Sequence, residues 1–175
     1  EAMLNYIEAQ YERYGSLDSK ALSYWGAIRE RAKVDTDVSK TIAATDMTIE
    51  AQNDWGAYSA GNLIDETLYN IRRERRCELM AEGLRTKDLQ RWRSMDQLIS
   101  EPYHIEGFKI WGPMKGWYGS QLKHGTSDAN VSSPSRSKYL RPYEKTESSE
   151  AYNGLTFSMA HYLSPLGVQE MILTS

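Results

Sequence analysis

The residues from Glu74 to Trp92 constrain the fold of this chain more than any other stretch of its sequence. They read ERRCELMAEGLRTKDLQRW, in which charged residues of both signs alternate with apolar residues at helical spacing. Glu74, Glu78 and Glu82 recur at every fourth position, so we expect them along one stripe of a helix. Arginines are interleaved with these glutamates, close enough for charge-assisted pairing.

The charge balance of this stretch favours pairing within the protein over attraction to an anionic polymer. From Asp65 to Asp96 there are eight Lys or Arg and seven Asp or Glu, so the segment is nearly neutral. We expect a buried or half-buried ion-pair network that holds the long helix in place, with the alternative of nucleic-acid binding opposed by the glutamates. The expected members of the network are Arg72, Glu74, Arg75, Arg76, Glu78, Glu82, Arg85 and Asp88.

The same stretch resembles the signature of the SusD/RagB family, which reads roughly E-R-R-x-E-L-x-x-E-G-x-R-x-x-D-L-x-R-W. Twelve positions match in one ungapped run, which makes the signal specific. They are Glu74, Arg75, Arg76, Glu78, Leu79, Glu82, Gly83, Arg85, Asp88, Leu89, Arg91 and Trp92. The interior departs from the family's usual apolar or aromatic residues at Cys77, Met80, Ala81 and Thr86.

A second match lies near the end of the chain, where HYLSPLGVQEM resembles the family segment Y-L-x-P-I-x-x-x-E-I. Tyr162, Leu163, Pro165, Leu166 and Glu170 carry this match. The resemblance implies that the chain is the C-terminal portion of such a protein, with the N-terminal part missing. SusD-like proteins are exported lipoproteins anchored through a cysteine at the mature N-terminus. Cys77 lies inside the signature helix, so we interpret it as a small buried apolar residue.

The first 34 residues predict a helix hairpin. Residues 2–14 place Leu4, Ile7 and Tyr11 on one helical face, and Gly15 is a plausible C-cap. Asp18 is a plausible N-cap for a second helix, whose apolar residues are Ala21, Leu22, Trp25, Ile28 and Ala32. The spacing resembles one tetratricopeptide-like unit.

The rest of the chain predicts two further regions. Residues 35–101 combine a polar connection with the signature helices, one from about Leu63 to Leu84 and a shorter one from about Lys87 to Ile99. Residues 102–175 are rich in Gly, Pro, Ser and aromatic residues and lack helical periodicity, so we expect ordered loops with a few short strands and, after Pro165, a short helix. We interpret 1–34, 35–101 and 102–175 as parts of one SusD-like domain.

The aromatic residues after Pro102 are candidates for ligand binding. Exposed Trp and Tyr on loops suit carbohydrate, because a pyranose presents a flat C–H face to the ring. We single out Trp111, Trp117 and Tyr118 as the edge of a sugar-facing surface. Polar partners could come from Lys109, Lys115, Gln121, His124, Asp128 and Asn130. The alternative is that these rings hold the loops onto the helical scaffold.

Other chemistry finds little support in the sequence. Glycoside hydrolysis needs two acids that flank a cleft, one with a raised pKa, and the acids here are interleaved with arginine or scattered over polar loops. His104, His124 and His161 lack metal-like or triad-like spacing, and one cysteine excludes a multi-cysteine metal site. No run of about 18 apolar residues is present. We expect no cofactor, no metal and no catalytic residues.

The sequence therefore predicts a mainly α fold, an α/α superhelix of SusD type, with a tetratricopeptide-like hairpin, a long charged helix and a loop-rich aromatic region. The resemblance implies a non-catalytic lipoprotein of the outer membrane, facing outward and attached only through its absent N-terminus. It would capture glycan for nutrient uptake and polysaccharide utilisation, and deliver it to a TonB-dependent, SusC-like transporter. The first alternative is a helical-repeat module that binds protein only; a glycoside hydrolase comes third.

Overall fold

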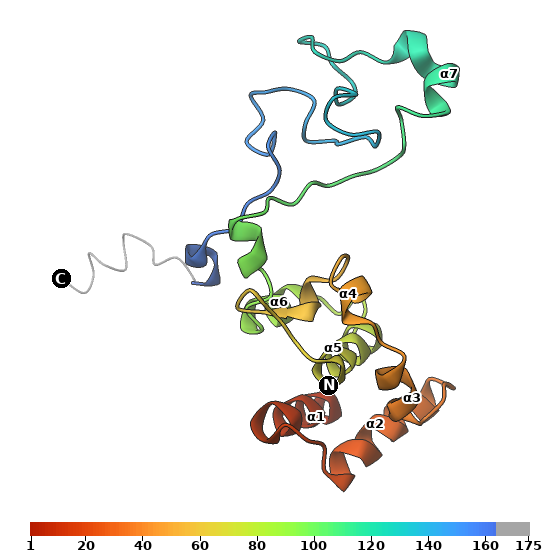
Figure 1. Cartoon of the computed structure of the whole chain (residues 1–175), viewed down its shortest axis with the longest axis vertical. Coiled ribbons are helices and arrows are strands. Elements are labelled where there is room, and N and C mark those ends of the chain that lie inside the picture. Colours follow the sequence, from red (N-terminus) through yellow and green to blue (C-terminus); the bar gives the residue numbers. More distant parts are fainter. Residues whose placement is uncertain (164–175) are drawn as a thin grey trace, which may run out of the picture. The chain divides into compact units, whose positions relative to one another are not determined.

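The computed structural model describes residues 1–163, and the chain divides into two compact units, Glu1–Asp96 and Gln97–Ser175. The described residues are mainly helical, with one two-stranded sheet among them, which confirms the mainly α prediction (Figure 1). Pro165, Leu166 and Glu170 of the second family match, together with the helix expected after Pro165, lie outside the described residues.

The first unit begins with the predicted helix hairpin. Helix α1 spans Ala2–Tyr14 and α2 spans Ser19–Arg31. Gly15 ends α1 with a left-handed φ of 65°, a conformation that costs glycine little. The Asp18 carboxylate accepts a hydrogen bond from the Ala21 amide and caps α2. Both predicted caps are confirmed.

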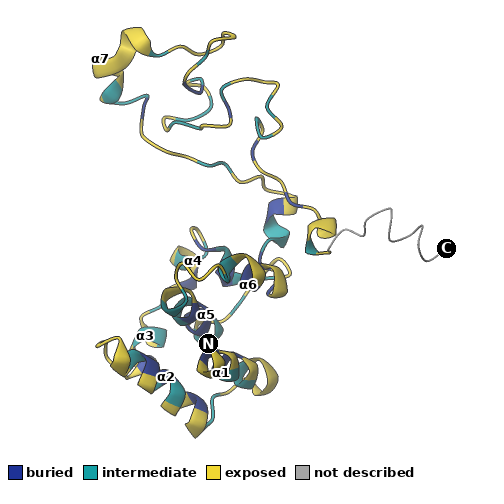
Figure 2. Cartoon of the chain, turned by 180° about the vertical axis from the view of Figure 1, so that it is seen from behind, coloured by how far each residue is buried: buried dark blue, intermediate teal, exposed yellow. Residues whose placement is uncertain are grey.

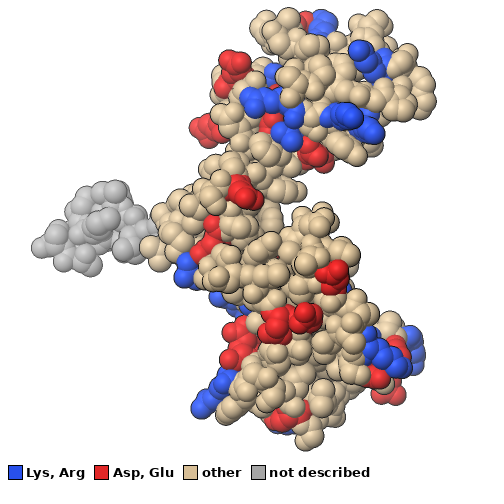
Figure 3. Space-filling view, in the orientation of Figure 1, with Lys and Arg blue, Asp and Glu red and all other residues tan. Residues whose placement is uncertain are grey.

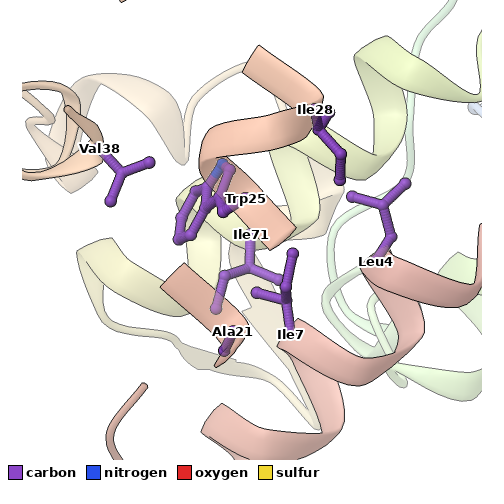
Figure 4. Packing of buried hydrophobic residues seen from close by; sticks show 7 residues of the cluster. All are labelled: Leu4, Ile7, Ala21, Trp25, Ile28, Val38 and Ile71. Atoms are coloured by element: carbon purple, nitrogen blue, oxygen red, sulfur yellow. The ribbon is translucent and has the colours of Figure 1, made fainter. Parts of the chain in front are cut away.

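The hydrophobic core of this unit lies where α1, α2 and α5 (Glu66–Glu78) pack together (Figure 4). Its buried residues come from these helices and from α3 (Val38–Ala43), and they are Leu4, Ile7, Ala21, Trp25, Ile28, Val38 and Ile71. Leu22, another apolar residue of the second predicted helix, is exposed because Ala21, Trp25 and Ile28 occupy the buried side of α2. One hairpin thus needs the signature helix to complete its core.

The connection between the hairpin and the signature helix is more structured than the loop with a short helix that the sequence indicates. It contains α3, α4 (Met47–Glu50), the 3₁₀ turn η1 (Trp55–Ala57) and the strands β1 (Tyr58–Ser59) and β2 (Asn62–Leu63). The two strands pair antiparallel. The helical elements begin at capping aspartates, as α5 does, and these caps are Asp37, Asp46, Asp54 and Asp65.

The signature does not form one helix from Leu63 to Leu84, so that prediction is wrong at both ends. Helix α5 ends at Glu78, and the chain turns through Ala81 and Gly83, with φ values of 67° and 74°. Residues with a left-handed backbone interrupt the hydrogen bonds of an α-helix, and glycine adopts this conformation easily because it has no Cβ. The next segment divides into α6 (Arg85–Arg91) and the 3₁₀ turn η2 (Asp96–Ile99), the latter spanning the end of the first unit and the start of the second.

The described part of the second unit is dominated by loops, as the sequence predicts (Figure 2). Its helical elements are short: α7 (Met114–Tyr118), η3 (Gly119–Gln121) and η4 (Met159–Tyr162). The expected short strands are reduced there to an isolated antiparallel bridge between Tyr103 and Leu155. The loops are nonetheless ordered around buried residues, which are Leu98, Ile110, Val131, Ser132, Glu144 and Phe157.

Replacing Ile7 with alanine should lower the free energy of unfolding by about 2–5 kcal/mol, because Ile7 is 1% exposed and the lost methyl groups leave a cavity. Leu22→Ala on α2 removes a similar volume from a side chain that is 45% exposed, and should change it by less than about 0.5 kcal/mol. Urea denaturation of the full chain measures both. Equal effects of the two substitutions would contradict the three-helix core.

Candidate functional site

Trp111 anchors the aromatic loops of the second unit. Its indole Nε1 donates a hydrogen bond of 2.9 Å to the carbonyl of Ser132, and the His124 ring meets its ring edge-to-face at a centroid distance of 5.3 Å. Its backbone amide donates to the carbonyl of Lys138, 3.0 Å away. Trp111 is therefore half-buried and holds three segments together, as the loop-holding alternative supposed for these rings.

Trp117 and Tyr118 lie differently, because both project from the short helix α7. Trp117 is 75% exposed and Tyr118 is 44% exposed. An exposed indole keeps a broad apolar face in water, and that face can be covered by a flat apolar ligand surface. Of the three candidates named from the sequence, these two rings are available to a ligand.

The polar candidates near these rings divide into two groups. Asn130 is engaged within its own loop, since its Oδ1 accepts from the Lys123 amide at 2.8 Å and its Nδ2 donates to the Gln121 carbonyl at 2.7 Å. Asp128 accepts from Thr126 Oγ1 and forms an ion pair with Lys123. These residues shape the loop. Lys109 and Lys115, by contrast, are exposed and form no ion pair with any other residue in 1–163.

A buried carboxylate, that of Glu144, binds several residues of the same unit. Glu144 is 3% exposed and accepts from His104 Nδ1 and from the Arg141 guanidinium at 3.3 Å. Arg141 also donates to Glu106 at 2.9 Å. Hydrogen bonds from the Ser137 hydroxyl and then from Arg141 lower the pKa of Glu106. Ion pairs of this kind can hold loops in place where regular backbone hydrogen bonding is sparse.

In the first unit, two of the arginines of α5, Arg72 and Arg75, are buried. Arg72 is 2% exposed, and its guanidinium donates to the carbonyls of Gly56 and Tyr58, both at 3.1 Å, and to Ser59 Oγ at 2.8 Å. It also lies over the Trp92 ring at 4.5 Å from the centroid. Burial lowers the pKa of the Arg72 guanidinium. Arg72 thus joins α5 to η1 and to the β1–β2 hairpin.

Arg75 and Asp88 form the most buried charge pair of α5, at 2.7 Å, with both side chains less than a tenth exposed. Arg75 also donates to Asn5 Oδ1 at 2.7 Å. Asp88 accepts a second hydrogen bond, from Arg91 at 2.9 Å. The pair therefore joins α5 to α6 and, through Asn5, to α1.

Glu8 of α1 completes this cluster from the other side. It is 4% exposed and accepts two hydrogen bonds from the Arg91 guanidinium, at 2.5 and 2.6 Å, and one from the Trp92 indole. A bidentate guanidinium–carboxylate pair fixes geometry as well as charge. The Arg and Trp that close the family signature are thus held by a residue 83 positions upstream.

The remaining network members pair with residues of other elements and not with neighbours on the same helix. Glu74 accepts from Arg29 at 3.0 Å and from the Trp25 indole at 2.9 Å. Glu78 pairs with Arg31. Arg76 and Arg85 both reach Asp54, at 3.0 and 2.5 Å. The glutamates of α5 therefore bind α2, and its arginines bind α1, α6 and the connection.

Two residues of the signature differ from the sequence-based interpretation. Glu82 lies beyond the end of α5, is exposed, and forms no ion pair with any residue in 1–163. Cys77 is exposed, not buried, because the inward face of α5 is occupied by Ile71, Arg72 and Arg75. The helix thus shows its thiol to solvent.

The partners of this network were not predicted from the sequence; among them are Asn5, Glu8, Glu12, Arg29, Arg31 and Asp54. They lie between 22 and 84 positions from the residues of the network that they contact. No local sequence pattern predicts ion pairs between residues so far apart. Only the strong excess of charge at helical spacing indicated that partners had to exist.

Two further properties concern the described residues as a whole. Within 1–163, no group of three or more His, Cys, Asp and Glu residues is arranged to hold a metal ion. Over the same residues, no helix combines the length and the apolar character that crossing a membrane requires.

The first unit is a helical scaffold fixed by charge pairs, and the second unit exposes aromatic rings that can contact a ligand. The family model described as the SusD family matches residues 1–165 of this chain, and the chain belongs to that family. Comparisons with curated proteins and with solved structures gave no match.

Membership indicates a non-catalytic, glycan-binding role in nutrient uptake. Proteins of this family are generally binding proteins rather than enzymes. They are typically associated with the cell surface and the outer membrane.

Replacing Arg75 with alanine should lower the free energy of unfolding by about 3–5 kcal/mol, because Asp88 would keep a buried charge with only Arg91 beside it. Glu82→Ala, in the same signature but exposed, should change it by less than about 0.5 kcal/mol. Thermal and chemical denaturation of the full chain compare the two. A cost near zero for Arg75→Ala would show that the pair contributes no structural constraint.

Proposed function

We propose that this chain is part of a surface lipoprotein that captures oligosaccharide at the outer membrane and delivers it to a TonB-dependent, SusC-like transporter. The family match over residues 1–165 carries this proposal, because it covers nearly the whole chain. The charge-paired first unit supplies a rigid scaffold, and ligand contact falls to exposed side chains.

Within the chain, we propose that sugar contact is made by the α7 face of the second unit. Trp117 and Tyr118 support this role, since both rings are exposed while Trp111 is committed to holding the loops. A pyranose stacked on an indole places C–H groups against the ring and leaves its hydroxyls at the rim. Tyr118 adds a phenolic hydroxyl that can donate or accept at that rim.

A protein-binding role remains a second candidate, favoured by an open cavity of about 470 Å³ in the first unit. It is lined by apolar and charged residues from the N-terminal part of α1, from α2, from the end of α5 and from the turn after α5. The apolar residues are Ala2, Met3, Leu4, Ala27, Ile28 and Leu79. A cavity lined by both apolar and charged residues suits a protein side chain. Co-purification with a transporter in the absence of any sugar binding would favour this role.

Replacing Trp117 with alanine should weaken oligosaccharide binding by about tenfold, since the ring supplies the largest exposed apolar face of α7. Affinity gel electrophoresis against a panel of polysaccharides, followed by calorimetry on the strongest ligand, measures the effect.

Tyr14→Ala is the matched control, because Tyr14 is an aromatic residue of the first unit that is 61% exposed. It should leave affinity unchanged. Retention of full affinity by the Trp117 variant would remove α7 from the sugar-binding surface. A full chain that binds no polysaccharide in the panel would count against glycan capture itself.

A further inference from the structure

Positive charge is concentrated in one part of the second unit. Residues 107–143 contain six Lys or Arg and one acidic residue, Asp128, although the chain as a whole has a net charge of −3. The basic residues are Lys109, Lys115, Lys123, Arg136, Lys138 and Arg141. Figure 3 shows Lys and Arg side chains gathered on the visible face of this unit, with fewer acidic side chains among them.

Half of these cations are already neutralised or covered, and half are free. Lys123 pairs with Asp128, Arg141 pairs with Glu106 and Glu144, and Arg136 lies over the Tyr152 ring at 3.8 Å. Lys109, Lys115 and Lys138 are exposed, and none of them forms an ion pair with another residue in 1–163.

The backbone brings the three free lysines to one region. The segment 107–111 runs beside 138–140, linked by hydrogen bonds from Leu140 N to the Phe108 carbonyl and from Trp111 N to the Lys138 carbonyl. The stem of Lys109 lies against Gly112, because a Cβ placed there would be 3.4 Å from Lys109 Cγ. Lys115 follows within the first turn of α7.

Exposed aromatic residues lie within a few positions of each of these lysines in the sequence. Phe108, 72% exposed, precedes Lys109, and Tyr139, 42% exposed, follows Lys138. Trp117 and Tyr118 follow Lys115 on α7. The lysine patch, defined as Lys109, Lys115 and Lys138, thus lies among rings that can stack on sugar faces. Its ammonium groups add three charges that can meet anionic substituents.

Resting on the glycan-binding function proposed above, we propose that this surface selects anionic polysaccharide, with uronate carboxylates or sulfate esters bound by the lysine patch while the pyranose rings stack on α7. Three unpaired cations beside aromatic rings fit a chain that repeats both a negative charge and a flat apolar face. A neutral glycan would satisfy the rings and leave the ammonium groups in water. Because the lysines are exposed, binding is sensitive to salt.

The test compares polymers that share a backbone and differ in charge. Polygalacturonate is set against its fully methyl-esterified form, and chondroitin sulfate against desulfated chondroitin, which separates carboxylate from sulfate. We expect the full chain to bind at least one of the two more highly charged polymers about tenfold more tightly than its less charged counterpart, with the difference shrinking between 50 and 500 mM NaCl.

The triple variant K109Q/K115Q/K138Q should lose that preference, bringing the affinity for the anionic polymer down about tenfold while its affinity for neutral polymers stays the same. The variant K20Q/K33Q/K87Q removes the same charge from the first unit and should keep the preference. Circular dichroism of each variant confirms folding, and these surface substitutions leave the buried residues untouched.

The outcomes separate the two proposals. Equal binding of charged and masked polymers overturns the anionic preference and leaves glycan capture standing. Single-stranded DNA bound as tightly as the anionic glycan also overturns it, because charge alone would then suffice. Binding of none of the polymers, nor of any neutral glycan, overturns the proposed function.

Discussion

The burial of charge on α5 is the constraint on which the first unit depends. Arg72 and Arg75 are almost wholly buried, and a guanidinium removed from water destabilises the fold unless its donors are satisfied. Carboxylates and carbonyls supplied mainly by α1, α6 and η1 bind the terminal nitrogens of both guanidinium groups, whereas the Nε of Arg72 is buried without a hydrogen-bond partner among residues 1–163. The positions of these elements are therefore tied to the arginines. Breaking one pair leaves the opposite charge buried, which is costly. The hydrophobic core alone would fix the packing of three helices, while the charge pairs also fix the loops between them.

Whether a feature of the first unit could be predicted from the sequence depends on how far apart in the chain the interacting residues are. The caps at Gly15 and Asp18 are local, because each depends on a few successive residues, and the sequence predicted both. The partners of the arginines are non-local: Arg91 meets Glu8 across 83 positions, and no periodicity specifies that choice. The prediction of the length of α5 was wrong for a related reason. Glu82 continues the helical spacing, yet the turn through Ala81 and Gly83 ends the helix before it.

Cys77 and Trp111 show that the environment of a single residue is also difficult to predict from the sequence. Both were judged from residue type and neighbours, and the sequence does not say which face of a helix or loop is covered. Cys77 is exposed because two arginines and an isoleucine take the inner face of α5, a reversal of the usual apolar-inside pattern. Trp111 was grouped with Trp117, but a carbonyl acceptor on Ser132 and the His124 ring commit it to the loops. The sequence identified the aromatic region, and the contacts determine which rings are free.

The two units therefore use charge in opposite ways. In the first, nearly every charged residue of the signature is neutralised by a specific partner, which makes the helices rigid and leaves them little net attraction for a ligand. In the second, acidic residues are few between 107 and 143, and lysines stay unpaired beside exposed rings. An unpaired surface lysine contributes little to folding, so its placement is not explained by stability. Three such lysines interleaved with exposed aromatic rings are explained if the ligand itself provides the missing negative charge.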